Sequence, residues 1–163
     1  MKKLRNLYIC LFLLTATITM DSCLRGKGDV VSQTFEVESF SGICNSIDAD
    51  IHITKSPVQS VEIVAQPNIT KNISLEVTDG ILNIKFKKKA NHYEDININI
   101  SMPELRSLAI CGTGNINTTN AFDSCGTVLI DISGSGNINA SFNSNSNTYT
   151  KIIDETINIS VKK

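Results

Sequence analysis

Residues 111–122 read CGTGNINTTNAF and residues 133–142 read SGSGNINASF, and these two stretches decide the fold. Both contain Gly-x-Gly-Asn-Ile-Asn, and the second copy starts 22 residues after the first. Ile116 and Ile138 occupy the same place in each copy, so apolar positions repeat together with turn residues. A fixed period of this kind indicates coils of similar structure that stack on one another.

The residue types in the motif suit the corner of such a coil. Glycine accepts positive φ without steric cost, and Asn tolerates it better than most other residues. Equivalent residues of stacked strands lie about 4.8 Å apart, so Asn115 is expected beside Asn137 in an amide ladder. The predicted corner, which is also a possible ligand surface, comprises Gly112, Gly114, Asn115, Asn117, Gly134, Gly136, Asn137 and Asn139.

Elsewhere the chain alternates apolar, mostly β-branched residues with polar ones. A period of two predicts half-buried strands, and no convincing amphipathic helix is found. Thr78-Asp79-Gly80 separates two of the runs, and Asp-Gly favours a tight hairpin turn. The alternating runs lie at residues 47–53, 73–77, 82–86, 96–102, 128–132 and 157–161. The sequence therefore predicts an all-β protein.

Two all-β organisations remain open. One is a right-handed β-helix or β-solenoid with antiparallel hairpin strands in the N-terminal half, which explains residues 105–142 best. The alternative is a β-sandwich of antiparallel strands, which explains residues 34–102. Residues 26–30 (GKGDV) read as a degenerate third copy of the motif. Two coils are fewer than a solenoid usually needs, so the N-terminal strands should extend or cap the same core.

The N-terminus predicts export and lipid anchoring. Residues 2–5 carry three positive charges, and residues 7–20 are apolar but too short to span a membrane. Cys23 follows directly, as in a loose version of a bacterial lipoprotein box. We therefore expect a lipoprotein signal peptide at residues 1–22, a lipidated segment at 23–33 and one β domain at 34–163.

Composition argues against several classes of function. Without residues 1–22 the chain has 12 basic and 15 acidic side chains, which disfavours nucleic acid. Cys44, Cys111 and Cys125 lack metal-site spacing, so no metal and no cofactor is expected. An exported protein can form a disulfide, but the sequence leaves its pairing open.

The sequence offers two chemical interpretations, a phosphate-binding loop and a catalytic pair of carboxylates. A phosphate loop at residues 112–114 lacks the third glycine, since Asn117 takes its place, and lacks a following helix. Asp48 and Asp50 lie on one face of a predicted strand, about 6.5–7 Å apart, which suits acid–base work on a glycosidic bond. Charged side chains for solubility are the simpler explanation of this pair, so no catalytic residue is assigned.

The order of several short segments resembles the family described as putative auto-transporter adhesin, head GIN domain, of Gram-negative bacteria. The resemblance covers residues 26–142 and includes the two Gly-x-Gly-Asn-Ile motifs. It implies a secreted or lipid-anchored envelope protein with a β-helical fold and no established activity. The other segments are GKGDVV (26–31), FSGI (40–43), IHIT (51–54), SVEI (60–63), VTDGILNI (77–84) and INISMPEL (98–105).

The expected function is that of a non-enzymatic cell-envelope lipoprotein with an adhesin-like binding or structural role. Cys23 would attach it to the outer membrane, on a face that the sequence leaves open, and a glycan or a surface protein would be its partner. Two alternatives stay open: a β-helical glycan-active enzyme that uses Asp48 and Asp50, and a structural protein that self-associates through the end of the solenoid.

Overall fold

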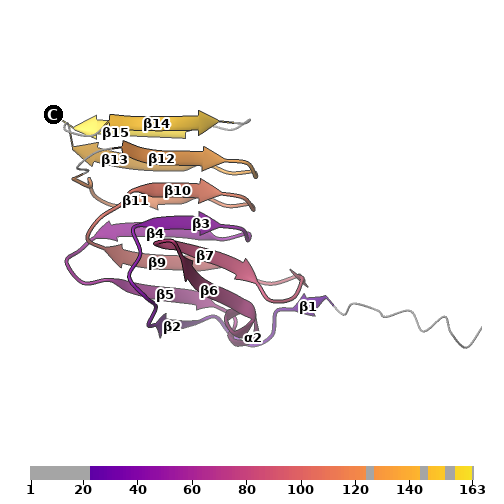
Figure 1. Ribbon diagram of the computed structural model, residues 1–163. Helices are drawn as coiled ribbons and strands as arrows, with labels where there is room; N and C mark the ends of the chain where they lie inside the picture. Colours follow the sequence, from indigo (N-terminus) through magenta and orange to yellow (C-terminus); the bar gives the residue numbers. More distant parts are fainter. Residues whose placement is uncertain (1–22, 124–126, 144–146, 153–156, 163) are drawn as a thin grey trace, which may run out of the picture.

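The computed structural model describes residues 23–123, 127–143, 147–152 and 157–162. Strands dominate these residues, so the all-β prediction is confirmed (Figure 1). The elements are β1 (Leu24–Arg25), β2 (Val31–Phe35), β3 (Gly42–Asn45), β4 (Asp50–Lys55), β5 (Ser60–Ala65), α2 (Pro67–Asn72), β6 (Ile73–Thr78), β7 (Ile81–Phe86), β8 (Ala90–Asn91), β9 (Asn97–Met102), β10 (Ser107–Ile110), β11 (Ile116–Thr118), β12 (Thr127–Ile132), β13 (Ile138–Asn143), β14 (Asn147–Ile152) and β15 (Ile157–Lys162).

Most strands belong to two mixed sheets that enclose one core. The six-stranded sheet has the order β14-β12-β10-β3-β7-β6, and the seven-stranded sheet has the order β15-β13-β11-β4-β9-β5-β2. β1 and β8 form a separate parallel pair. Apolar side chains from both large sheets make a single buried cluster. Two sheets that face each other in this way are arranged like a sandwich.

Parallel pairing stacks the strands into layers, with equivalent strands of neighbouring layers side by side. Each of these layers has one strand in the six-stranded sheet and a later strand of the chain in the seven-stranded sheet, as in β10 with β11 and β12 with β13. Leu108 pairs with Ile130, and Ile116 pairs with Ile138. The two Gly-x-Gly-Asn-Ile-Asn motifs therefore lie side by side on neighbouring layers.

The layers do not follow the order of the chain. The layer of β3 and β4 lies between the layer of β10 and β11 and the layer of β7 and β9 (Figure 1). After β4 the chain builds β5 to β9 on one side, and then crosses to start β10 on the other side. The N-terminal strands thus extend the core of the motif layers, as the sequence predicts.

Antiparallel pairing is confined to one end of the molecule. β6 and β7 form the predicted hairpin, in which Asp79 (φ 52°) and Gly80 (φ 72°) both have the positive φ of a type I′ turn. β2, β5 and β9 also pair antiparallel. The expectation of antiparallel strands throughout residues 34–102 is wrong for β3 and β4, because these two are inner strands of parallel ladders.

Two further expectations need correction. Six residues form a short helix, α2, which begins with Pro67 at its first turn, where proline needs no hydrogen-bond partner. A helix of this length leaves no periodic signal in the sequence. Residues 26–30 do not form a third copy of the motif. The N–H of Lys27 donates to Asn68 (2.8 Å), and the C=O of Gly28 accepts from Gln66 (3.0 Å), so this segment packs beside α2.

Candidate functional site

A polar face covers the seven-stranded sheet on the side away from the core. Along each strand, fully buried Ile residues such as Ile116 and Ile138 alternate with polar residues that point outward. The parallel register aligns these outward residues in columns that cross the strands. We call this surface the polar face; it comprises Asp50, His52, Asn97, Asn99, Asn115, Asn117, Asn137 and Asn139.

The first column is an amide ladder that ends on a carboxylate. The side-chain amide of Asn137 donates to Oδ1 of Asn115 (3.1 Å), and the amide of Asn115 donates to Oδ1 of Asp50 (2.9 Å). The backbone N–H groups of Asn137 and Asn115 donate to the same two oxygens, at 3.3 and 3.0 Å. The predicted contact between Asn115 and Asn137 is therefore present, and the ladder continues to Asp50, which the repeat does not predict.

The second column has the same chemistry one position further along the strands. Asn139 donates to Asn117 (2.9 Å), whose neighbour on the next strand is His52. Asn99 pairs with His52 on the far side and donates to Oε2 of Glu62 (2.8 Å). The hydroxyl of Ser32 also donates to Glu62, and these two bonds hold the pKa of Glu62 below its usual range.

Close approach between layers explains the motif glycines better than backbone freedom alone. A Cβ on Gly114 (φ 115°) would lie 2.2 Å from the carbonyl oxygen of Ala49, and one on Gly136 would lie 1.8 Å from that of Gly114. Asn115 and Asn137 do not have positive φ, contrary to expectation. They are needed for the ladder, and the glycines let the layers approach.

An acidic pocket of about 100 Å³ lies where β4 and β9 begin, at the end of the first column. Asp50 belongs to both features, because it accepts the ladder bonds and lines the pocket. The other lining residues come from the segments directly before the two strands: Asp48, Ala49, Tyr93, Glu94, Asp95 and Ile96. The pocket therefore combines four carboxyl groups with one aromatic ring.

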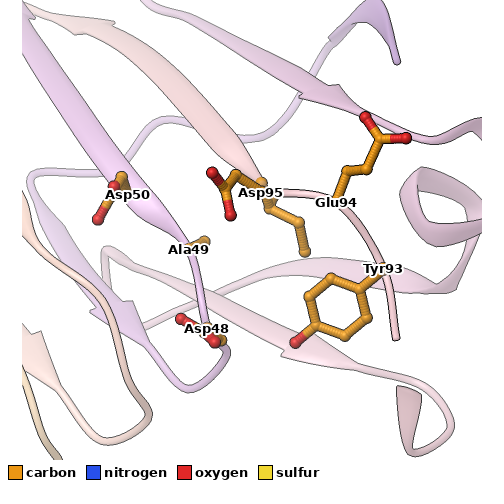
Figure 2. Close-up of a pocket in the computed structure, with 7 residues that line it drawn as sticks. Asp48, Ala49, Asp50, Tyr93, Glu94 and Asp95 are labelled. Carbon is orange, nitrogen blue, oxygen red and sulfur yellow. The ribbon is translucent and has the colours of Figure 1, made fainter. Parts of the chain in front are cut away.

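The side chains of the pocket differ in their surroundings (Figure 2). The Tyr93 ring packs edge-on against Phe86, with 5.6 Å between ring centres, and its hydroxyl is directed toward Asp48. Burial raises the pKa of Tyr93, and the charges of Asp48 and Cys23 act in the same direction. Glu94 turns away toward Gln66, whose amide it accepts at 3.4 Å. Asp48, Asp50 and Asp95 are the other carboxylates that line the pocket.

The structure thus gathers residues that sequence reasoning had kept apart. Asp48 and Asp50 both line the pocket, but Asp48 lies before β4, so the two do not share one strand face as the sequence predicts. Tyr93, Glu94 and Asp95 were not among the predicted site residues. A signal for them exists, since DADIHI (48–53) and DININI (95–100) share the pattern Asp-x-[Asp/Asn]-Ile-x-Ile. The motif layers carry the related pattern Gly-Asn-Ile-Asn, so all four segments start a strand of the same sheet with the same polar column.

The predicted lipidation residue and the thiols are placed as follows. Cys23 is the first described residue and is half-buried next to β1, while the predicted signal peptide at residues 1–22 lies outside the described residues. Cys44 and Cys111 are free thiols in this structure, and Cys125 lies outside the described residues. In the described part of the chain, no helix is long and apolar enough to cross a membrane. Within the same ranges, no group of three or more His, Cys, Asp or Glu side chains is arranged to hold a metal ion.

Several solved structures have a fold similar to that of this chain. A protein of Parabacteroides distasonis ATCC 8503 described as a putative adhesin is 20% identical with a TM-score of 0.66, and the match covers 87% of this chain and 68% of that one. One of Bacteroides fragilis NCTC 9343, with the same description, is 20% identical with a TM-score of 0.64 and coverages of 82% and 66%. One of Parabacteroides merdae ATCC 43184 is 11% identical with a TM-score of 0.55 and coverages of 86% and 99%. At these identities the likeness establishes the fold alone.

Family comparison is more decisive. Among curated proteins none matches the chain. The family model described as "Putative auto-transporter adhesin, head GIN domain" matches residues 39–152, a range that includes both motif copies, the polar face and the acidic pocket. The chain therefore belongs to the head GIN domain family of putative auto-transporter adhesins.

Proposed function

We propose that the chain is a non-enzymatic protein of the cell envelope that binds a glycan through the polar face and the acidic pocket. The observation that carries this proposal is the alignment of amides and carboxylates across strands that lie about 4.8 Å apart. Amides donate and accept hydrogen bonds and carboxylates accept them, so the columns match a ligand with hydroxyls at regular intervals. The pocket adds the Tyr93 ring at the end of one column.

The adhesin-like character of the family supports a binding role. The polar face also suits a long ligand, because its columns cross several strands instead of converging on one point. We further propose that the parallel layers form a β-solenoid. The chain spans 68% and 66% of two of the similar solved structures, so further layers could lengthen the same face in larger relatives.

A glycan array with the purified full chain tests the binding role. Binding should fall at least tenfold in Asn117→Ala and in Tyr93→Ala, because these remove a column amide and the pocket ring. Thr127→Ala, an exposed residue of the opposite sheet, is the matched control and should bind like the wild type. Circular dichroism must show that all variants are folded. Absence of binding to any glycan, or equal binding by all three variants, would refute the proposal.

Anchoring through Cys23 is the second part of the proposal. Cleavage before Cys23 and lipidation of its thiol would attach the domain to the outer membrane. Labelling with radioactive palmitate should mark the wild type and leave Cys23→Ser unmarked. Protease treatment of whole cells then determines the membrane face, since a surface-exposed domain is digested and a periplasmic one is protected. Labelling that persists in Cys23→Ser would exclude this anchor.

A glycan-active enzyme is the alternative that one observation favours, namely that Asp48, Asp50 and Asp95 line one pocket together with Tyr93. A pair of carboxyl groups at a suitable separation can cleave a glycosidic bond. Turnover of any polysaccharide that is lost in both Asp48→Asn and Asp50→Asn would establish this role and overturn the non-enzymatic proposal. Binding without turnover supports the adhesin-like role.

Self-association through the edge of the stack is a further proposed partnership. β14 and β15 lie at the edge of their sheets in the described structure, and a strand edge can pair with another chain. Sizing chromatography over a range of protein concentrations tests it. A monomer at the highest concentration would exclude the contact.

A further inference from the structure

Two thiols that are far apart in the chain lie against each other on the outer side of the six-stranded sheet. Sγ of Cys44, in β3, is 3.4 Å from Sγ of Cys111, which directly follows β10. The backbone N–H of Cys111 donates to the C=O of Asn45 (2.8 Å), so the peptide that carries this thiol is fixed against β3. Cys111 is exposed and Cys44 is half-buried, which leaves the pair accessible to a small reagent.

The surroundings favour a thiol over a thiolate at Cys44. Burial raises the pKa of Cys44, and the hydrogen bond with Cys111 and the charges of Cys111 and Asp131 act in the same direction. A contact with Ser46 at 3.9 Å acts against them. Thiols are weak donors and weak acceptors, so their contact contributes little to stability while both are reduced. The placement matters because a disulfide needs the sulfurs only about 1.4 Å closer than they are.

We propose that Cys44 and Cys111 form a disulfide in an oxidising compartment. The oxidant is a second disulfide, either a protein thiol oxidase of the envelope or a small disulfide. The exposed Cys111 loses its proton to solvent and attacks the oxidant, which releases one thiolate and leaves a mixed disulfide. Cys44 then loses its proton and attacks the Cys111 sulfur, which forms the Cys44–Cys111 bond and releases the second thiolate. Two thiols are oxidised, one disulfide is reduced, and the two protons end on the released thiolates.

The disulfide would join β3 to β10, the two neighbouring strands at which the order of the layers departs from the order of the chain. β3 and β10 are neighbours in the sheet, yet the two cysteines are 67 residues apart, and β5 to β9 are built between them. A disulfide across a long loop removes much of the freedom of the unfolded chain. It would therefore hold the returning strand β10 on β3 and stabilise the base of the motif layers.

Peptide mapping of the full chain tests the pairing. A protease that cleaves before Asp gives separate fragments for the three cysteines: 29–47 with Cys44, 95–122 with Cys111, and 123–130 with Cys125. After treatment with oxidised glutathione and alkylation, we expect fragments 29–47 and 95–122 to be linked and fragment 123–130 to be alkylated. A linked pair that includes Cys125, or alkylation of all three, would overturn the proposal.

Melting of the oxidised and reduced protein tests the stabilising role. Oxidation should raise the Tm of the wild type and of Cys125→Ser by roughly 5–15 °C. It should leave the Tm of Cys44→Ser and Cys111→Ser unchanged; each variant is compared only with its own reduced form, so a folding defect cannot imitate the result. Equal Tm values for the oxidised and the reduced wild type would contradict the stabilising role of the disulfide. These measurements use purified protein, so they stand or fall separately from the envelope location.

Discussion

Single atoms set the distance between the motif layers. Gly114 and Gly136 face backbone oxygens of the preceding layer so closely that a methyl group has no room. This constraint is stronger than the need for an unusual φ, because the carbonyls that a new Cβ would meet belong to the backbone of Ala49 and Gly114, just before β4 and β11, and cannot move without shifting those strands. The glycines of the motif are therefore fixed by packing between layers, and the ladder of Asn side chains depends on them.

Replacing Gly114 with Ala should destabilise the protein by about 2–4 kcal/mol, since the new Cβ meets the Ala49 carbonyl and φ is unfavourable for Ala. Thr113→Ala changes the exposed residue beside it and should alter stability by less than about 0.5 kcal/mol. Urea unfolding of both variants measures the difference. Equal stability of the two would show that the layers are not in contact at Gly114.

The ladder makes a second prediction for single residues. Asn115→Asp removes the amide that donates to Asp50 and sets two carboxylates side by side, so it should cost about 2–3 kcal/mol at pH 7. The loss should shrink below about pH 4, where carboxylates become protonated. Adding Asp50→Asn restores one amide and one carboxylate and should recover at least half of the loss. A double variant that is no more stable than Asn115→Asp would contradict the ladder.

At the scale of elements, exposed carboxylates fasten neighbouring strands and loops. Glu62 accepts from Ser32 and Asn99, Glu76 from Lys85 and Ser74, and Asp123 from Lys55 and Asn143. In each case the hydrogen bonds are the main cause that holds the pKa below its usual value. These contacts join β2, β5 and β9, then β6 and β7, then β4 and the segments around β13.

A pH dependence follows from these three groups. Their folded pKa values lie below the unfolded ones, so their contribution is complete only above about pH 5 and is lost as the pH falls through the folded values. We expect the Tm to drop between pH 5 and about pH 3, and to drop less at high salt. Because the groups are exposed, the change should be small. Glu62→Gln should reduce it, and a Tm that rises on acidification would contradict the assignment.

Elements with a regular pattern could be predicted from the sequence, and their neighbours could not. Alternation of Ile with polar residues identifies β4, β7 and β9 because one face of each strand is buried. The Asp79-Gly80 turn is equally local. The position of β3 between β7 and β10 leaves no trace in the sequence, since its partners lie far along the chain.

The candidate site was predictable to a similar extent. The Asn115–Asn137 contact follows from the repeat, because both residues are Asn and their spacing is regular. Asp50 escaped notice as the next member because it replaces Asn at that position and lies outside the period. The pocket needs β4 and β9 as neighbours, so Tyr93 and Asp95 could be assigned to it only once the pairing was known.

At the scale of the whole molecule, the arrangement of the layers depends on the stacking of the two motifs in register. This stacking aligns the polar columns, places β12 and β13 beside β10 and β11, and supplies the extended surface of the proposed glycan site. Thr113 and Ser135 are exposed residues of the two motifs and form an isolated parallel bridge. They therefore report on the register directly, without a change to the ladder.

Cross-linking of cysteines at these positions is the most direct measurement. In a chain whose Cys44, Cys111 and Cys125 are replaced by Ser, Thr113→Cys with Ser135→Cys should be joined almost completely by a short bifunctional thiol reagent. Thr127→Cys is the control partner for Thr113→Cys: it is closer along the chain, but β12 extends about 3.3 Å per residue and carries it to the far end of the layer. Stacking in register predicts efficient linkage of residue 113 with residue 135 and little linkage of residue 113 with residue 127. Little linkage of 113 with 135, or equal linkage of both pairs in a folded protein, would contradict the stacked arrangement.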